Sequence, residues 1–410
     1  MQRAGETRTG AQGEFRMRDV VIVEAGRSAI GKRGGALATA HPADVLGPVM
    51  MEIIRRAGLE SGQVDQVVGG CINKLGAQAM NITRTAWLSH GGAEHVASTT
   101  IDSQCGSSQQ ALNQAYSLVA SGVEDVVLAC GVENMSRLPI GSDAEAGAKA
   151  GMGKPISRSY FGHYEFVSQF EGAERIADKY GITREQTDQF GLQSQLRAAE
   201  AIREGRFEQQ IVPVEVDVLD EKGQRTGERR VVSLDEIPRE TSLEKLAALK
   251  PVARDNGVHT AGTSSQIADG ASAVLVMAAD RAEKLGVRPL ARIVGTALVG
   301  CDPVLMLEGP IPATRKLLDR AGLSIEDIDV FEINEAFASV VLAWAKELGP
   351  DMARVNPNGG AIALGHPLGG TGCFLATKAV HELVRTGARY GLVTMCCGGG
   401  LGTGTLIEAV

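Results

Sequence analysis

The chain lacks the features that mark several large classes of protein. Its 410 residues contain no apolar run long enough to span a bilayer, so no membrane-spanning helix is expected. Its 49 acidic and 41 basic residues are mixed without a long block of one sign, which indicates neither a nucleic acid nor an anionic membrane surface as partner. With 44% hydrophobic and 22% charged residues, the composition is that of a soluble globular protein with two or three cores.

The seven cysteines also lack a metal-binding pattern. No pair has the spacing of a zinc site, and the adjacent Cys396 and Cys397 cannot easily ligate one ion together, so no metal site is expected. Cysteines in a large chain without a hydrophobic secretory segment indicate a reducing compartment. Since the C-terminal residues are no peroxisomal address, the cytoplasm is the expected location. Cys71, Cys130 and Cys373 are expected to be small core residues.

The chain repeats itself at long range, which constrains the fold more than any local pattern. The stretch Arg56-Ala-Gly-Leu returns as Arg320-Ala-Gly-Leu, each time followed at the same offset by an aliphatic residue and an aspartate. In both copies the pattern predicts helix, strand, helix and strand in the same order, at 44–58, 66–70, 106–121 and 125–130, and again at 312–322, 330–333, 371–386 and 390–396. We therefore predict two duplicated α/β units, each a sheet covered by helices.

Residues 135–267 have no counterpart in the second copy and are interpreted as an insertion. Its first part, 141–164, is rich in Gly, Ser and Ala and is predicted to form loops; helices follow at 171–180 and 183–204, the second opened by Thr183. Its basic residues are candidates for contact with a phosphorylated ligand, although such charges are more often solvated surface. They are Lys222, Arg225, Arg229, Arg230, Arg239, Lys245 and Lys250.

Three glycine-framed stretches carry reactive side chains: Cys105-Gly-Ser-Ser, Gly365-His-Pro and Cys396-Cys-Gly-Gly-Gly. A thiol reacts as its thiolate, which a helix N-terminus and a nearby imidazole favour. Neighbouring glycines let a substrate carbonyl approach backbone N–H groups and be held there as an oxyanion. Together the three stretches indicate thioester chemistry, although taken alone Cys105 fits a core residue and Asn334 a strand-end cap.

In these and other motifs the chain resembles the thiolases, the acetyl-CoA C-acyltransferases, over roughly 18–410. Six segments in the family's order carry the resemblance: Ile101-Asp-Ser-Gln-Cys-Gly-Ser-Ser, Val132-Glu-Asn-Met-Ser, Thr260-Ala-Gly-Thr-Ser-Ser, Ile333-Asn-Glu-Ala-Phe, Asn358-Gly-Gly-Ala-Ile-Ala-Leu-Gly-His-Pro and Met395-Cys-Cys-Gly-Gly-Gly. The resemblance implies an α/β thiolase-like fold of two βαβαβαββ halves, which form a layered α/β/α/β/α core.

The implied division of the chain has four parts. Residues 1–17 are a polar N-terminal extension, with Met17 as an alternative start. The N-terminal half comprises 18–134 and 268–287, the loop domain that covers coenzyme A comprises 135–267, and the C-terminal half comprises 288–410.

The resemblance also implies a role for each site residue. Cys105 is the acyl-accepting nucleophile, His366 activates it, and Cys396 moves the proton at C2 of the acetyl group. Asn334 holds a water and makes one oxyanion hole with His366, and the backbone N–H groups of Cys105 and Gly398 make the other. Contacts with coenzyme A are implied for the segment that contains Ala261, Gly262 and Ser265.

The implied activity is cleavage of a 3-oxoacyl-CoA by coenzyme A into acetyl-CoA and a shortened acyl-CoA, with the reverse Claisen condensation on the same atoms. Coenzyme A is a substrate here, no permanently bound cofactor is implied, and a homodimer or homotetramer is expected. Two alternatives remain, a non-catalytic acyl-CoA-binding protein and a 3-oxoacyl synthase-like enzyme. The presence of Cys396 argues against the synthase.

Two departures from the family pattern bear on the substrate. Ser108 replaces a usual glycine, and Gln169-Phe-Glu-Gly lacks the Met-Gly common in the covering loop of short-chain thiolases. Both positions are expected near the acyl pocket, so acetoacetyl-CoA is not the expected preferred substrate. The chain is more similar to bacterial degradative thiolases, among them those that cleave steroid side chains.

Overall fold

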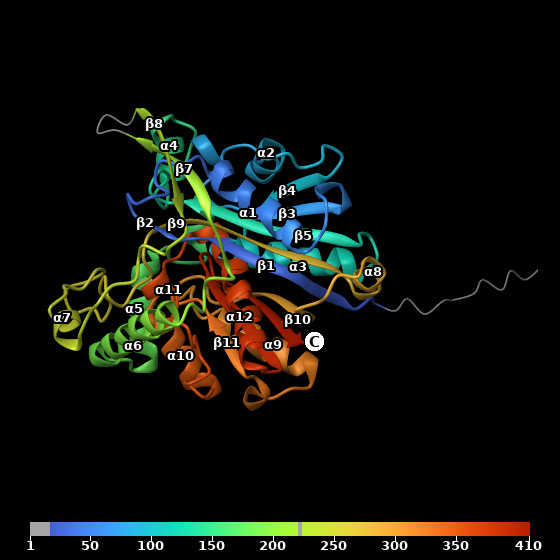
Figure 1. Ribbon diagram of the computed structural model, residues 1–410. Helices are drawn as coiled ribbons and strands as arrows, with labels where there is room; N and C mark the ends of the chain where they lie inside the picture. Colours follow the sequence, from blue (N-terminus) through green and yellow to red (C-terminus); the bar gives the residue numbers. More distant parts are fainter. Residues whose placement is uncertain (1–16, 220–223) are drawn as a thin grey trace, which may run out of the picture.

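The computed structural model describes residues 17–219 and 224–410. Most of the predicted N-terminal extension, residues 1–16, therefore lies outside the described residues, as does Lys222. In the parts described, one large sheet is covered by helices on both faces and a small two-stranded sheet stands apart (Figure 1).

The N-terminal half of the sheet has the order β4-β3-β5-β9-β1. These strands span Ala97–Ile101, Gln66–Gly70, Val126–Asn134, Ala268–Ala278 and Val20–Ser28. Strand β3 runs parallel to β4 and β5, whereas β9 runs antiparallel to both β5 and β1.

The C-terminal half repeats this arrangement strand for strand. Its order is β11-β12-β13-β10, spanning Val330–Ile333, Tyr390–Cys397, Leu401–Ala409 and Ala291–Gly300. Again β11 is parallel to β12, β13 is antiparallel to its two neighbours, and Val355 bridges Phe331 in parallel where β4 pairs β3 in the first half. The predicted duplication is confirmed by this common order.

The two halves join edge to edge where β1 and β10 pair through Val21 with Arg292 and Ile22 with Ala291. With the short strands β2 (Gly31–Lys32) and β6 (Ile211–Val212), the described residues form one eleven-stranded sheet rather than two separate ones. Because only two residue pairs join β1 to β10, the sheet can twist strongly between them, and its two halves then face each other across the helices that lie between.

Helices fill three layers around the strands. Helices α3 (Ser107–Ala120) and α12 (Thr371–Thr386) lie between the halves, in one apolar cluster with inward residues of both, such as Val127 and Val393. Helices α1 (Pro42–Arg56) and α2 (Ile82–Ser89) cover the outer face of the first half. Helices α9 (Pro310–Ala321) and α10 (Ala338–Leu348) cover the outer face of the second. The predicted α/β/α/β/α layering is thus confirmed.

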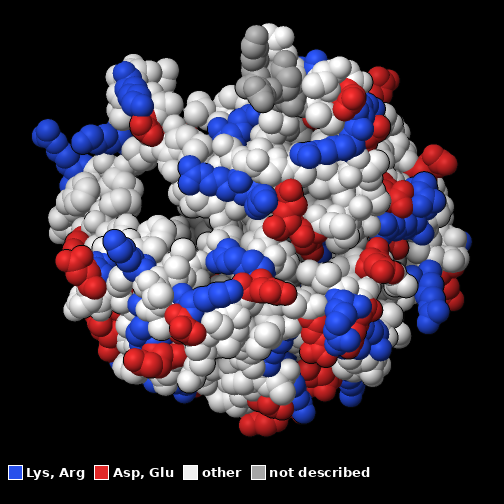
Figure 2. All heavy atoms as spheres, turned by 60° about the vertical axis from the view of Figure 1, so that its left-hand side comes forward, with Lys and Arg blue, Asp and Glu red and all other residues white. Residues whose placement is uncertain are grey.

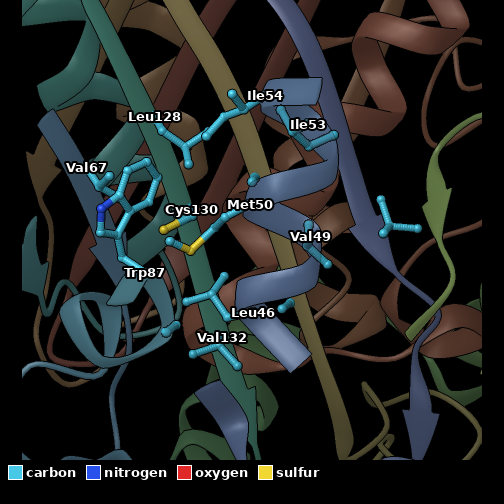
Figure 3. Close-up of a cluster of buried hydrophobic side chains, with 14 of the residues drawn as sticks. Leu46, Val49, Met50, Ile53, Ile54, Val67, Trp87, Leu128, Cys130 and Val132 are labelled. Carbon is cyan, nitrogen blue, oxygen red and sulfur yellow. The ribbon is translucent and has the colours of Figure 1, made fainter. Parts of the chain in front are cut away.

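The alternation of side chains along β5 shows why the layers form. Leu128 and Cys130 point toward α1 and α2, and Val127 and Ala129 point toward α3, because successive strand residues face opposite sides. Figure 3 shows Cys130 beside Met50 of α1 and Trp87 of α2. Cys71, Cys130 and Cys373 are all fully buried, as expected of small core residues.

Residues 135–267 lie between β5 and β9, and those described rejoin the large sheet only at β6, which pairs with β1. They contain α4 (Ser142–Lys149), α5 (Gln169–Tyr180), α6 (Arg184–Arg203), the β7–β8 hairpin (Val214–Leu219 and Arg225–Val232) and α7 (Leu243–Ala247). The predicted cap of α6 is confirmed, since Thr183 and Gln186 form a capping box.

The prediction of loops over 141–164 is wrong, because α4 and a short 3-10 turn, Arg158–Gly162, form there. The helix α4 carries Asp143 and Glu145 in its first turn and Lys149 in its last, and an ion pair joins Glu145 to Lys149. These charges complement the helix dipole and support a helix in part of the Gly-, Ser- and Ala-rich stretch for which loops were predicted.

No helix in the described ranges is both long enough and apolar enough to cross a membrane.

Candidate active site

Cys105 lies in the turn between β4 and α3. Gly106 is the N-cap of α3, and Gln104 adopts a left-handed φ of 53° that turns the chain from strand to helix. The Cys105 side chain is almost fully covered, with 5% of its surface exposed. The predicted nucleophile therefore sits at a helix start, inside the molecule rather than on its surface.

Burial decides the protonation of Cys105. It raises the pKa of the thiol to about 11, although hydrogen bonds from the backbone N–H groups of Gly398 and of Cys105 itself lower it in part. The sequence-based expectation of a stabilised thiolate is therefore wrong for the free protein, because desolvation raises the pKa more than the two backbone N–H groups lower it. The contact with the Gly398 N–H brings two predicted site residues together.

His366 and Asn334 form a buried pair. The Nδ2 of Asn334, which follows β11, lies 3.4 Å from the Nε2 of His366. The Nδ1 of His366 lies 2.6 Å from the Thr371 hydroxyl at the start of α12. Since an amide nitrogen can only donate, the geometry favours the tautomer with hydrogen on Nδ1 and a lone pair on Nε2. Burial lowers the pKa of His366 to about 4, so the ring is neutral near pH 7.

The side-chain oxygen of Asn334 is a further feature of the site. This Oδ1 is buried and has no hydrogen-bond partner among the described residues. A buried amide oxygen without a protein partner suits contact with a water or a ligand.

Cys396 lies at the end of β12, fully buried, beside Phe337 and Ala336 in an apolar cluster that α5 helps to form. Burial raises the pKa of the Cys396 thiol well above the usual value, and Cys105 raises it further. The next residue, Cys397, points the other way, because its Sγ faces Gly106 at the start of α3. The two adjacent thiols therefore face different surroundings.

Ser108 packs in the layer between the two halves, and its expected proximity to the acyl pocket stays a prediction. Its hydroxyl accepts a hydrogen bond from the backbone N–H of Cys373 at 3.0 Å, so its side chain lies between α3 and α12. The serine is fully buried in the layer between the two halves. Its departure from the family glycine is a feature of core packing, and it gives no support to a non-catalytic protein.

A cleft of about 710 Å³ leads to this region. Ala261 and Ser265 line it, whereas Gly262 does not and packs beneath Leu246 and Leu249 of the loop domain. Figure 2 shows the corresponding side of the molecule hollowed, with lysine and arginine side chains around the hollow. Phe170 also lines the cleft, and its ring packs edge-on against that of Phe337, with 5.3 Å between the ring centroids.

Arg239 is one of the basic residues predicted as ligand contacts, and it lines this cleft. Lys32 and Arg33, from the N-terminal part of the chain, line it as well. Arg225 and Arg229 instead form ion pairs with acidic residues of β7. Lys32 and Arg33 were missed because no local pattern connects a Gly-Lys-Arg-Gly turn with a segment some 200 residues away.

Two glutamines near the reaction centre were also missed as site residues. The amide groups of Gln104 and Gln169 approach the position that a side chain at Gly398 would occupy. The only sequence signal at position 169 is that its stretch lacks the Met-Gly pattern of short-chain thiolases. Within the described residues, no group of three His, Cys, Asp or Glu side chains is arranged to hold a metal ion.

Comparison with known proteins identifies the family. The thiolase N-terminal domain model matches residues 20–280, and the thiolase C-terminal domain model matches residues 287–409. The chain belongs to the thiolase family.

Individual relatives of this thiolase cover nearly its whole length. It is 48% identical to the steroid 3-ketoacyl-CoA thiolase FadA6 of Mycobacterium tuberculosis, over 96% of this chain and 94% of the relative. It is 41% identical to the acetyl-CoA acetyltransferase of Syntrophomonas wolfei, over 96% of this chain and all of the relative. The crystal structure of the Bacillus anthracis acetyl-CoA acetyltransferase superposes with a TM-score of 0.88 at 38% identity, covering 97% of this chain and all of that one.

These findings confirm the predicted enzyme class. The thiolase is an acyltransferase that acts on 3-oxoacyl-CoA with coenzyme A, and neither a non-catalytic binding protein nor a 3-oxoacyl synthase is favoured.

Proposed function

We propose that this thiolase cleaves its substrate through an acyl group carried on Cys105. The observations that carry the proposal are that Cys105 contacts the N–H of Gly398, two residues after Cys396, and that Asn334, paired with His366, donates its own backbone N–H to the carbonyl of Thr394, two residues before Cys396. The site groups come from four separate segments of the chain, and each is a group that the reaction requires.

In the first step the Cys105 sulfur bonds to the 3-keto carbon, and its proton passes to Nε2 of His366. Because thiol and imidazole are both neutral beforehand, proton transfer accompanies the attack. The resulting oxyanion accepts hydrogen bonds from the N–H groups of Cys105 and Gly398, which already contact the sulfur.

In the second step the C2–C3 bond breaks, leaving the acyl group on Cys105 and the electron pair on the acetyl-CoA enolate. The charge on its oxygen is stabilised by the imidazolium of His366 and by a water held on Asn334, whose Oδ1 is otherwise unpaired among the described residues. Cys396 then gives its proton to C2, and acetyl-CoA leaves.

In the last step the thiol of free coenzyme A passes its proton to the Cys396 thiolate and attacks the acyl group. Cys105 leaves with the proton held by His366, so all three groups return to their starting states. Condensation of two acetyl-CoA molecules is the same sequence reversed.

We propose further that the preferred substrate is a bulky 3-oxoacyl-CoA of the kind produced in steroid breakdown. This is supported by the 48% identity to a protein named a steroid 3-ketoacyl-CoA thiolase, against 41% for an acetyl-CoA acetyltransferase. The stretch that begins at Gln169, which lacks the Met-Gly common in the covering loop of short-chain thiolases and approaches Gly398, also favours a substrate other than acetoacetyl-CoA.

For coenzyme A, the proposal assigns the pantetheine arm to the cleft beside Ala261 and Ser265, with Gly262 shaping that segment from beneath. Lys32, Arg33 and Arg239 are placed to meet phosphates because they line the same cleft. Coenzyme A is bound as a substrate, and no permanent cofactor takes part.

The division of the chain and its assembly complete the proposal. The halves 18–134 with 268–287 and 288–410, and the loop domain 135–267, are supported by family matches that meet between 280 and 287. A homodimer or homotetramer is supported by the partly exposed strand β4 at the end of the described sheet order, which offers an edge for pairing. The cytoplasm remains the predicted location.

The test is the intact mass of the protein after exposure to acetyl-CoA, with peptide mapping and Cys105→Ala as control. We expect one acetyl group on Cys105 that free coenzyme A removes. A comparison of kcat/KM for acetoacetyl-CoA, a long-chain 3-oxoacyl-CoA and an alicyclic 3-oxoacyl-CoA then tests the substrate class. Absence of an adduct with every one of these thioesters would overturn the proposed mechanism.

A further inference from the structure

Directly after Asn334 stands a carboxylate that the proposed mechanism does not use. Glu335 is 1% exposed, and no lysine or arginine of the described residues forms an ion pair with it. A buried carboxylate is retained only where hydrogen bonds compensate its desolvation. The identity of its hydrogen-bond partners therefore indicates what the residue does.

Three segments donate to Glu335. Its Oε1 accepts from Asn356 Nδ2 at 2.9 Å, and its Oε2 accepts from the Ser194 hydroxyl at 2.6 Å and from the Ile362 N–H at 3.1 Å. Ser194 belongs to α6 of the loop domain, and Ile362 belongs to the short helix α11 (Ala361–Leu364). One carboxylate thus connects the end of β11, the loop domain and α11.

Two of these connections lead to the predicted oxyanion hole. Helix α11 ends two residues before His366, whose own N–H donates to the carbonyl of Gln266. Asn356 donates to the carbonyl of Ile333 and accepts from its N–H, both at 2.9 Å, immediately before Asn334. Glu335 therefore touches the supports of both members of the Asn334–His366 pair.

The fit around Glu335 leaves no room for adjustment. A Cβ on Gly360 would lie 2.3 Å from the Glu335 carboxyl carbon. Asn356 holds a left-handed φ of 46°, and its amide cannot turn over without losing both bonds to Ile333. The orientation of the Asn356 amide obliges its partner at 335 to be an acceptor.

From these contacts we infer that Glu335 is a positioning residue for the reaction, which holds Asn334 and His366 at the distance that stabilises the enolate. The inference rests on the proposed function, because it assigns Glu335 to the enolate step and not to acylation of Cys105. It also links that step to the loop domain, since Ser194 is one of the three donors.

Glu335→Gln is the sharpest variant, because it changes one oxygen to an NH2 group with little change in volume. The glutamine oxygen can serve Ile362 and Ser194, but its NH2 group then faces the NH2 group of Asn356. The two NH2 groups repel each other and displace the Asn356 side chain. Because Asn356 is bonded to Ile333, the displacement also moves Asn334, the next residue. The double variant Glu335→Gln/Asn356→Asp restores an acceptor opposite the new donor, while the N–H of Ile333 keeps its partner.

The experiment separates the two halves of the reaction in wild type and variants. Exchange of the C2 hydrogens of acetyl-CoA with D2O reports enolate formation, and the mass of the protein reports acylation of Cys105. In Glu335→Gln we expect exchange to slow by about 10- to 100-fold, the effect of one unsatisfied buried polar group, while acylation and KM change by less than about threefold. The double variant should recover part of the exchange.

Glu382→Gln is the control for changing a buried carboxylate elsewhere, although Glu382, unlike Glu335, is also ion-paired with Arg385. Glu382 is likewise a buried carboxylate with an asparagine partner, Asn358 at 2.8 Å, but it contacts neither Asn356 nor α11. Its exchange rate should stay within about threefold of wild type, since no support of Asn334 is altered.

A second readout does not depend on turnover. NMR titration of 13C-labelled histidine should show the pKa of His366 moving from its low value toward 6.5 in Glu335→Gln, because loosening α11 admits water to the ring. An unchanged His366 titration, together with exchange within about threefold of wild type, would overturn the inference. Failure of the wild-type protein to become acylated would instead overturn the proposed function, and the titration would still decide the role of Glu335.

Discussion

Cys105 and His366 are both uncharged in the free protein between about pH 4 and pH 11. Burial lowers the pKa of the imidazole to about 4, so it loses its proton above that pH. Burial raises the pKa of the thiol to about 11, so it keeps its proton below that pH. Two neutral groups avoid the desolvation cost of a buried ion pair before the substrate binds. Negative charge then develops during the reaction, on an oxygen that oxyanion-hole donors can stabilise.

This neutral state makes a testable prediction for thiol reactivity. Alkylation of Cys105 by iodoacetamide should speed up about tenfold per pH unit between pH 7 and pH 9, because the thiolate fraction of a group with a pKa of about 11 grows at that rate. The rate is measured by mass spectrometry of the Cys105 peptide, with Cys105→Ala as the blank. A plateau at neutral pH would show that a thiolate exists in the free protein.

The two adjacent thiols should differ in function because they face opposite sides of β12. Cys396→Ala should slow acetyl-CoA hydrogen exchange by about 10²- to 10⁴-fold, the usual contribution of a general acid or base, while Cys105 can still be acylated. Cys397→Ala, which removes a sulfur packed on Gly106, should leave exchange within about threefold since only packing changes. The opposite ranking of the two variants would reassign the second catalytic cysteine.

At the scale of elements, one buried ion pair fixes the cleft wall. The guanidinium of Arg27 in β1 contacts both carboxylate oxygens of Asp235, at 2.7 and 2.8 Å, and lies over the rings of Phe207 and Phe374. Asp235 also accepts the N–H of Ile30. The segment that follows, 236–239, lines the cleft assigned to coenzyme A. The pair therefore holds part of the loop domain on the sheet.

We expect Asp235→Asn to raise KM for coenzyme A about tenfold and to change kcat by less than about threefold, because the wall of the cleft is loosened while the reaction centre is intact. Steady-state thiolysis kinetics measure both constants. The control is Asp217→Asn, which breaks the exposed ion pair with Arg225 on the β7–β8 hairpin and should change neither. An effect on kcat alone would contradict this role of Asp235.

At the scale of the whole molecule, the site depends on contact between the two halves. Gln109 of α3 donates to the carbonyl of Val393 at 2.9 Å and to the hydroxyl of Thr405 at 3.1 Å, and accepts from Thr403 at 2.6 Å. These partners belong to β12 and β13 of the other half. Gly106, at the start of α3 and next to Cys105, likewise lies against the sulfur of Cys397 at the end of β12.

Gln109→Ala should lower the free energy of unfolding by about 2 to 4 kcal/mol, because it leaves buried polar partners unsatisfied as well as a cavity. Urea unfolding followed by circular dichroism measures the change. Gln110→Ala on the same helix, at a half-buried position, should cost less than about 1 kcal/mol. Equal effects of the two variants would argue that the contact between the halves is of little energetic weight.

The sequence by itself determined the duplicated order of helices and strands, because apolar periodicity, caps and glycine stops act over a few residues and recur in both copies. It also indicated the reactive residues, since Cys105, His366 and Cys396 stand in glycine-framed turns and Asn334 in a family motif. The α4 helix escaped prediction because its Gly-, Ser- and Ala-rich surroundings indicated loops, whereas acidic residues in its first turn and a lysine in its last favour a helix.

Only the tertiary structure decided which distant groups meet and what their surroundings do to them. Burial, a property of the folded whole, reversed the expected stabilisation of the Cys105 thiolate, and packing paired the Ser108 hydroxyl with the N–H of Cys373. Lys32 and Arg33 line the cleft, and Glu335 is bonded to Ser194 and Ile362, because the fold brings together segments that are far apart in the sequence. No local pattern indicates such contacts. Desolvation and long-range contact depend on the packing of all layers at once, and for that reason they could not be read from neighbouring residues.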